Sequence, residues 1–115
     1  MTVGSAEVVA RLEAERVRLV DQLAALRRTH GEIVEASELV ATDDEHDPEG
    51  ATIAFERAQV AALLRDGAVV LTEIDEALGR LDAGTYGTCV RCGRPIGAAR
   101  LEARPATPTC LDCAV

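Results

Sequence analysis

Apolar residues recur at alternating steps of three and four positions along two stretches of the chain, and this repeat limits the fold more than any other feature. The first stretch runs from about residue 5 to residue 41 and opens at Ser5, a residue type that caps helices. The second stretch covers residues 48–83, with Asp47 as a cap, Pro48 at the first helical position and Gly84 after its end. Both stretches therefore predict long helices.

Each predicted helix carries one apolar face with a few polar interruptions. In the first helix this face consists of Val9, Leu12, Arg16, Leu19, Leu23, Leu26, His30, Ile33, Ser37 and Val40. In the second helix it consists of Ile53, Arg57, Val60, Leu64, Gly67, Leu71, Ile74, Leu78 and Leu81. A short polar segment joins the helices, so we expect an antiparallel coiled-coil hairpin. Gly67 then faces Leu26, or else Asp66–Gly67 kinks the second helix.

Four cysteines near the end of the sequence form two Cys-x-x-Cys pairs, which are separated by 17 residues: Cys89 and Cys92, then Cys110 and Cys113. Four thiolates complete the tetrahedral shell of one Zn²⁺, and Gly93 suits the positive φ of such a turn. The alternatives are two disulfides or four free thiols, but we expect no export signal, and cysteine pairs in a protein that is not exported favour metal over disulfides. Because four protein ligands leave no position for water, the predicted zinc site is structural.

These features predict an all-α fold with two parts. Residues 1–83 form a long antiparallel coiled-coil hairpin with an acidic tip at residues 43–50, and residues 84–115 form a small four-cysteine zinc finger at its base. Only two residues, Phe55 and Tyr86, are aromatic, whereas the abundant Ala, Leu, Val and Ile suit packing between helices.

The formal net charge of −8 results from 12 Arg and 20 acidic residues, with no Lys. Binding to a phosphate backbone requires a cationic surface, so we expect no direct contact with nucleic acid. The apolar runs are too short to span a bilayer, and we expect a cytoplasmic monomer with no membrane partner.

The tip is unusually acidic, with Asp43, Asp44, Glu45, Asp47 and Glu49 close together. One interpretation is a solvated turn in which Asp47 caps the second helix and the other acids favour its dipole. The other is a carboxylate cluster that approaches a bound cation or a basic channel. The two interpretations are compatible. His46 in the tip is expected to be solvated, and His30 is expected to be half-buried.

Other side chains are expected to support this architecture. Tyr86 directly follows the second helix and should pack between hairpin and finger. Arg16 and Arg57 should pair with flanking acids. Arg100 and Arg104 should reduce the negative charge of the zinc site.

The finger contains Gly-Thr-Tyr-Gly-Thr-Cys-Val-Arg-Cys-Gly-Arg-Pro-Ile from residue 84, Arg-Leu-Glu-Ala-Arg-Pro from residue 100 and Cys-Leu-Asp-Cys from residue 110. It resembles the DksA/TraR family of bacterial zinc-finger transcription regulators, closely over residues 82–113. The resemblance implies a regulator that binds RNA polymerase rather than DNA. It also implies that the hairpin enters the secondary channel of the polymerase, where its tip approaches the catalytic Mg²⁺.

The tip departs from the Asp-x-x-Asp-x-Ala signature of that family. If Asp47 is the first Asp, Gly50 replaces the second and Thr52 replaces the Ala; if Asp44 and Asp47 are the pair, Glu49 replaces the Ala. An enzyme is not expected, because no catalytic arrangement of His, Cys or Ser and no phosphate-binding loop is present. The alternative to a polymerase-binding regulator is a zinc-stabilised coiled-coil adaptor for another protein.

Overall fold

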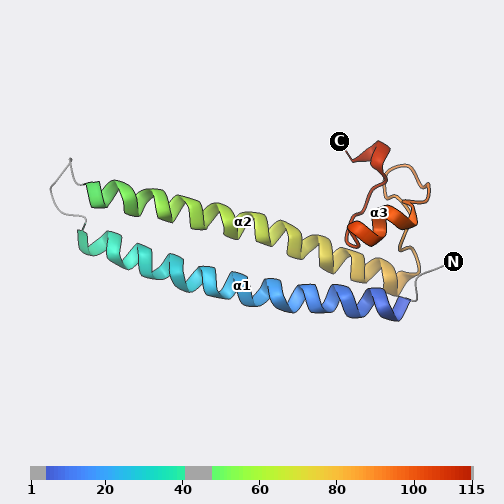
Figure 1. The fold of residues 1–115 in the computed structure, drawn as a ribbon, viewed down its shortest axis with the longest axis horizontal. Coiled ribbons are helices and arrows are strands. Elements are labelled where there is room, and N and C mark those ends of the chain that lie inside the picture. Colours follow the sequence, from blue (N-terminus) through green and yellow to red (C-terminus); the bar gives the residue numbers. More distant parts are fainter. Residues whose placement is uncertain (1–4, 41–47, 115) are drawn as a thin grey trace. The chain divides into compact units, whose positions relative to one another are not determined.

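The computed structural model describes residues 5–40 and 48–114, and side chains within 5–32 and 50–114. Its elements are α1 (Ser5–Val40), α2 (Pro48–Ala83), the short α3 (Ala98–Ala103) and a 3₁₀ turn, η1 (Leu111–Cys113) (Figure 1). The described residues form no strand, and only an isolated antiparallel bridge joins Thr88 and Pro95. The predicted all-α fold with two long helices is therefore confirmed.

None of the helices in the described part of the chain is both long enough and apolar enough to cross a membrane.

The end of α2 is closed by a glycine, as the sequence predicts. Gly84 has a φ of 77°. Its N–H donates to the carbonyl of Leu81 (3.3 Å), and the N–H of Thr85 donates to the carbonyl of Arg80 (2.9 Å). This pair of bonds is the Schellman motif, in which a left-handed residue lets the chain turn back over the last carbonyls of the helix. The first residues of the finger are positioned by this turn.

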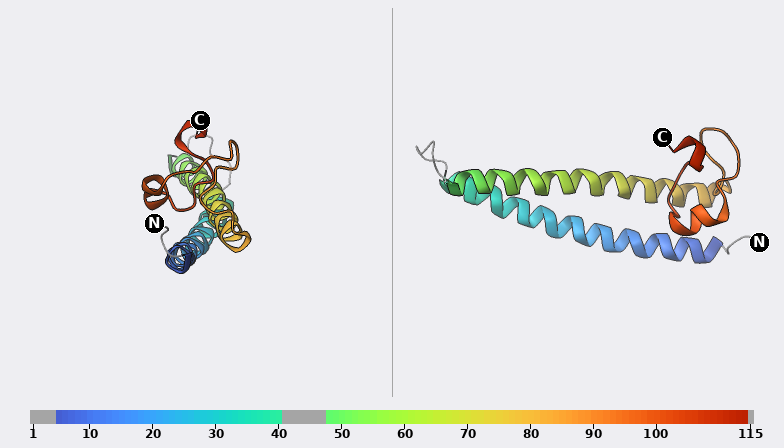
Figure 2. Two further views of the ribbon diagram at one scale, coloured as in Figure 1. Left: turned by 90° about the vertical axis from the view of Figure 1, so that its right-hand side faces the viewer. Right: turned by 45° about the horizontal axis from the view of Figure 1, so that its top comes forward.

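The chain forms two compact units. One comprises residues 1–18 and 70–115, and the other comprises residues 19–69. Within each unit, a stretch of α1 packs against a stretch of α2 that runs in the opposite direction (Figure 1, Figure 2). The division at residue 84 that the sequence suggests stays a prediction.

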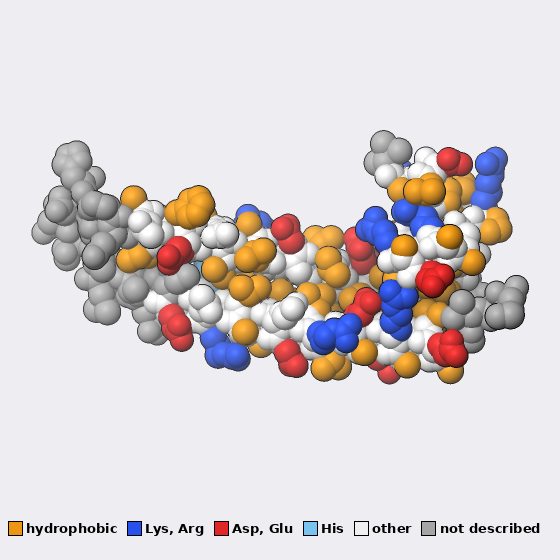
Figure 3. All heavy atoms as spheres, viewed as in Figure 1, with side chains coloured by type: hydrophobic (Ala, Val, Ile, Leu, Met, Phe, Trp, Pro, Cys, Tyr) orange, Lys and Arg blue, Asp and Glu red, His pale blue; other side chains and the backbone are white. Residues whose placement is uncertain are grey.

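The core of each unit is aliphatic. Leu12, Ile74 and Ala77 are almost completely buried in the unit that contains the finger, and Leu23 is buried in the other unit. Apolar side chains gather where the two helices meet within each unit (Figure 3). All described positions of the predicted apolar faces are buried or half-buried, except for Arg57, which is exposed. Ala77 is a core residue outside the predicted face.

Arg16, a polar residue within the apolar face of α1, forms an ion pair with a residue of α2. Its Nε lies 2.6 Å from Oδ1 of Asp75, which confirms the expected pairing with an acid. This hydrogen bond raises the pKa of the Arg16 guanidinium above its ordinary value. Both side chains are partly exposed, so water weakens the ion pair and it adds little stability. Its main effect is on the register between the two helices.

The side chain nearest to Gly67 is that of Leu23, not that of Leu26, so the predicted pairing is wrong. A Cβ atom built at residue 67 would clash with Cδ2 of Leu23, whose side chain occupies the space that the glycine leaves. Leu26, at the next position of the same face, is only half-buried. Helix α2 runs from Pro48 to Ala83 and continues through Gly67.

Alanine substitutions at two helical glycines test this contact. Gly79→Ala, with no atom within 4 Å of the added Cβ, should stabilise the protein by about 1 kcal/mol through helix propensity. Gly67→Ala should lose this gain, because Leu23 must move. Urea unfolding followed by circular dichroism measures both changes. An equal gain at the two positions would contradict the Leu23–Gly67 contact.

Candidate metal centre

The first cysteine pair lies on a tight turn between Thr88 and Pro95, which an isolated antiparallel bridge joins. The N–H of Cys89 donates to the carbonyl of Arg94 (2.8 Å), and the N–H of Gly93 donates to the carbonyl of Cys89 (3.0 Å). Gly93 has a φ of 74°, as predicted, although a Cβ there would meet no atom within 4 Å. The glycine is therefore required for its backbone conformation rather than for lack of space.

The second cysteine pair lies at the 3₁₀ turn η1. Cys110 is extended, and the N–H of Cys113 donates to its carbonyl (3.1 Å). Two bonds join the first turn to residues 108–113: Val90 N–H donates to the carbonyl of Pro108 (3.0 Å), and Arg91 Nη1 donates to the carbonyl of Cys113 (3.4 Å). These contacts hold the two turns face to face.

The four sulfur atoms lie within 4.8 Å of one another, and none belongs to a disulfide. The Sγ atoms of Cys92 and Cys110 are 3.7 Å apart. Four sulfurs at about 2.3 Å from a tetrahedral Zn²⁺ have neighbouring distances of about 3.8 Å, so this spacing fits zinc. The soft thiolate set also favours zinc over oxygen-preferring cations. The geometry thus favours metal over the disulfide alternative.

The thiols differ in acidity. Hydrogen bonds from the backbone of Cys92 and then of Cys110 lower the pKa of Cys89 to about 6. The pKa of Cys113 is raised to about 12, chiefly by its hydrogen bond with the Cys110 side chain and by burial. Backbone donors therefore lower the pKa of one thiol, while the neighbouring sulfurs raise the pKa of another. A divalent cation replaces those protons, so metal affinity increases with pH.

Arg100 of α3 supports the second cysteine pair. Its Nε donates to the carbonyl of Thr109 (2.8 Å), and its Nη2 donates to Oγ1 of Thr107 (3.1 Å). The Thr107 hydroxyl, buried with 4% exposure, also donates to the carbonyl of Thr109 (3.2 Å). The residue before Cys110 is therefore held by two donors. Sequence reasoning missed Thr107, and the expected effect of Arg100 and Arg104 on the charge of the site stays a prediction.

Removing this support should weaken zinc binding. Arg100→Ala should lower zinc affinity by about tenfold, because groups that orient metal ligands typically contribute 10- to 100-fold. Competition with a chromogenic chelator measures the change, and Arg94→Ala, at an exposed arginine of the first turn, is the matched control. Arg100→Lys should recover only part of the affinity, because an ammonium group cannot reproduce the forked geometry. Equal affinities for the Arg100 and Arg94 variants would contradict this role.

Tyr86 connects the start of the finger to the segment after α3. Its hydroxyl donates to the carbonyl of Pro105 (2.8 Å), and the ring is half-buried. Burial raises the pKa of Tyr86, although the charges of Arg80 and Arg11 act in the opposite direction. As the single tyrosine in a chain without tryptophan, it is a specific spectroscopic reporter of the finger.

The predicted partner-binding residues lie almost entirely outside the described part of the chain. This applies to Asp43, Asp44, Glu45 and Asp47, and also to His46. Only the backbone of Glu49 is described, in the first turn of α2. His30 is half-buried on α1, as expected. Within the described residues, only the cysteines form a cluster of potential metal ligands.

Two long helices and a pair of facing Cys-x-x-Cys turns define a C4-type zinc-finger protein. A protein family described as prokaryotic dksA/traR C4-type zinc finger has a model that matches residues 84–115. The solved structure of the transcription factor DksA2 from Pseudomonas aeruginosa is similar to this chain, with a sequence identity of 33% and a TM-score of 0.51. The match covers 90% of this chain and 79% of the DksA2 chain. This chain belongs to the DksA/TraR family, and the predicted resemblance is confirmed.

Two curated relatives match the finger region. The RNA polymerase-binding transcription factor DksA of Caulobacter vibrioides is 56% identical over 36 residues, which are 31% of this chain and 25% of that protein. The protein of the same name from Haemophilus influenzae is 43% identical over 44 residues, which are 38% and 30% of the two chains. The matched segment therefore spans between a quarter and a third of each relative.

Proposed function

We propose that this chain is a non-enzymatic regulator of transcription that binds RNA polymerase. The observation that carries the proposal is the likeness to DksA2, which extends over 90% of this chain. The curated relatives that share the finger are named RNA polymerase-binding transcription factors. The metal centre is consistent with a structural role, because four thiolates leave no coordination position for a substrate.

The proposed binding mode uses the hairpin over residues 1–83, with the zinc finger over residues 84–115 at its base. The hairpin enters the secondary channel, and the carboxylates of the tip act near the catalytic Mg²⁺. The partner-binding residues in this proposal are Asp43, Asp44, Glu45, Asp47 and Glu49. Carboxylates are suitable for that position because they are attracted to a bound Mg²⁺ and to basic channel walls.

The proposal also covers the setting in which the protein acts. A net charge of −8 supports binding to a protein rather than to DNA, because DNA binding depends on a cationic surface. We propose a monomer that acts in the cytoplasm, where the polymerase is found. Direct nucleic-acid and membrane contacts are not part of this mechanism.

Binding and regulation can be separated experimentally. Purified core RNA polymerase should retain the wild-type protein in a pull-down, and a photo-crosslinker at residue 45 should react with residues of the secondary channel. The triple variant Asp44→Ala/Asp47→Ala/Glu49→Ala should bind but lose its effect on transcription in vitro. Glu13→Ala/Glu56→Ala/Asp82→Ala, which removes the same charge at exposed helical positions, should behave like wild type.

Failure of the wild-type protein to bind core polymerase would overturn the proposal and favour an adaptor for another protein. Crosslinks that map to the outside of the polymerase would exclude insertion into the channel, even if binding itself is observed.

A further inference from the structure

The unit that contains the finger has a groove of about 490 Å³ next to the start of α1. Its apolar lining includes Val8, Leu101 and Pro105, together with the ring of Tyr86. This volume lies within the range of about 300–1,000 Å³ that is typical of binding sites. None of the described residues of the tip lines the groove, so it is distinct from the proposed contact with the polymerase channel.

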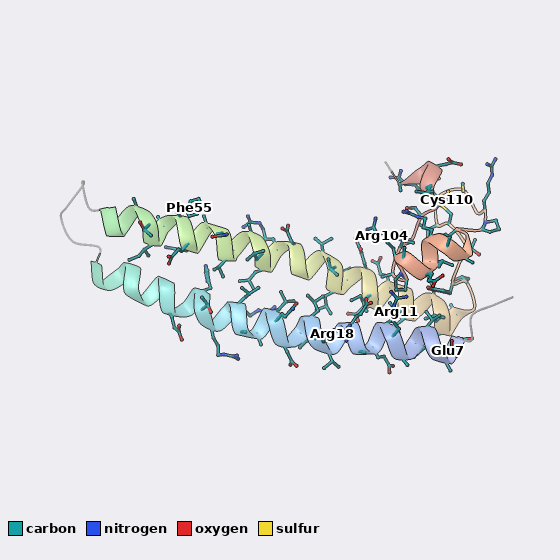
Figure 4. The ribbon with its side chains drawn as sticks, in the orientation of Figure 1. Glu7, Arg11, Arg18, Phe55, Arg104 and Cys110 are labelled. Atoms are coloured by element: carbon teal, nitrogen blue, oxygen red, sulfur yellow. The ribbon has the colours of Figure 1, made fainter. Side chains whose placement is uncertain are left out.

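Two of the polar groups at the groove already have partners. The Tyr86 hydroxyl donates to Pro105. Arg11 extends from α1 towards α3 (Figure 4), where its Nη1 donates to the backbone carbonyl of Glu102 (2.8 Å). Its Nε also lies 3.6 Å from the carboxylate of Glu15, which offsets its charge.

The remaining charged groups at the groove are two carboxylates. Glu7 and Glu102 line it, and both residues are exposed. Among the residues that the structure describes, neither carboxylate takes part in a hydrogen bond or ion pair. An apolar surface with an acidic rim is complementary to an aliphatic segment that carries a positive charge.

The backbone at the start of α3 does not block access to the groove. Gly97 precedes α3 with a φ of 102°, and a Cβ at this position would meet no atom within 4 Å. Ala98, the first residue of α3, is also exposed and contributes only a methyl group to the lining. Side chains of a partner could therefore reach the apolar surface without displacing parts of this chain.

We propose that this groove receives an aliphatic segment of RNA polymerase flanked by a lysine or arginine. The inference rests on the proposed function and adds a second contact surface to it, at the finger rather than at the tip. The aliphatic side chains cover Val8, Leu101 and Pro105, and the basic group pairs with Glu7 and Glu102. A second contact of this kind raises the overall affinity without changing the tip.

Filling the groove tests the apolar part of the proposal. In binding measurements on immobilised core polymerase with the full chain, Ala98→Trp should weaken binding by about tenfold, because a buried aromatic side chain excludes the partner segment. Ala99→Trp changes the neighbouring exposed residue of α3, which does not line the groove, and should bind like wild type. Equal binding by the two variants would overturn the proposal.

Charge reversal tests the acidic rim. Glu7→Arg/Glu102→Arg should weaken binding by about tenfold, since it places like charges against the basic group of the partner. The bond from Arg11 should persist, because it involves the backbone of Glu102. Glu13→Arg/Asp82→Arg makes the same change in net charge at exposed residues away from the groove. A similar loss in both double variants would indicate general electrostatic attraction and would also overturn the proposal.

Folding and the proposed function are checked separately. Each variant should retain one equivalent of zinc and the circular dichroism of the wild type. If wild-type protein fails to bind polymerase, the proposed function itself fails. If wild-type protein binds and the groove variants bind equally well, only the groove inference fails. A crosslinker at residue 98 should capture a polymerase peptide with aliphatic and basic residues, and an acidic peptide would contradict the inference.

Discussion

Cys92→Ser is expected to abolish stoichiometric zinc binding and to unfold the finger. A hydroxyl remains protonated where a thiolate is needed, so the metal would keep only three strong ligands. Binding of a structural zinc contributes about 10 kcal/mol or more in apparent free energy, which a segment with a small core cannot replace. Among the described residues of the finger, only three apolar side chains are buried: Cys89, Ile96 and Pro105.

Three measurements follow this loss. Zinc content after dialysis against a chelator should fall from one equivalent to near zero. The fluorescence of Tyr86 should change, because its hydrogen bond to Pro105 depends on the folded finger. Far-ultraviolet circular dichroism should decrease only slightly, since α3 has six residues whereas α1 and α2 have 36 each.

Ala99→Ser is the matched control, because it adds a hydroxyl at an exposed finger position. Cys110→Ser should behave like Cys92→Ser, since each cysteine pair supplies half of the shell. Retention of one tightly bound equivalent of zinc by either cysteine variant would show that the four thiols do not form a single site.

Leu23→Ala is expected to destabilise the unit of residues 19–69 by about 3 kcal/mol, within the usual range for buried leucine. Leu23 has 1% exposure, and its side chain fills the space beside Gly67. With no side chain at residue 67 to move inwards, the cavity should remain open and the full cost should be measured. Such a loss is a large part of the stability of a small protein.

Urea unfolding followed by circular dichroism measures this effect. Val17→Ala, at an exposed position of α1 with 60% exposure, should change the free energy of unfolding by less than about 0.5 kcal/mol. If both substitutions have the same effect, Leu23 is not part of a core. If Gly67→Ala suppresses part of the loss in the Leu23→Ala background, the two residues are in direct contact.

Much of the fold and of the metal site could be predicted from local chemistry. Pro48 and Gly84 mark the ends of α2 because a missing N–H and a positive φ are tolerated only at particular places in a helix. The four cysteines identify a metal site because their spacing is typical of zinc ligands. The positive φ of Gly93 was predicted for the same reason, since it is a property of the turn itself.

The support around the metal site could not be predicted in the same way. Arg100, Thr107 and Thr109 lie in a segment without periodicity, so their hydrogen bonds depend on how the loop folds over α3. The groove beside the start of α1 depends on residues that are far apart in the sequence, such as Val8 and Leu101. No sequence pattern links such residues.

The sequence by itself determined which residues form the two long helices, which of their faces are apolar and which four side chains are metal ligands. These properties depend on backbone preferences and on the identity of neighbouring residues. Only the tertiary structure decided that Gly67 meets Leu23 rather than Leu26 and that Asp75 pairs with Arg16. A heptad pattern is satisfied by several registers, and the choice among them is made by the shapes and charges of side chains that meet across two helices.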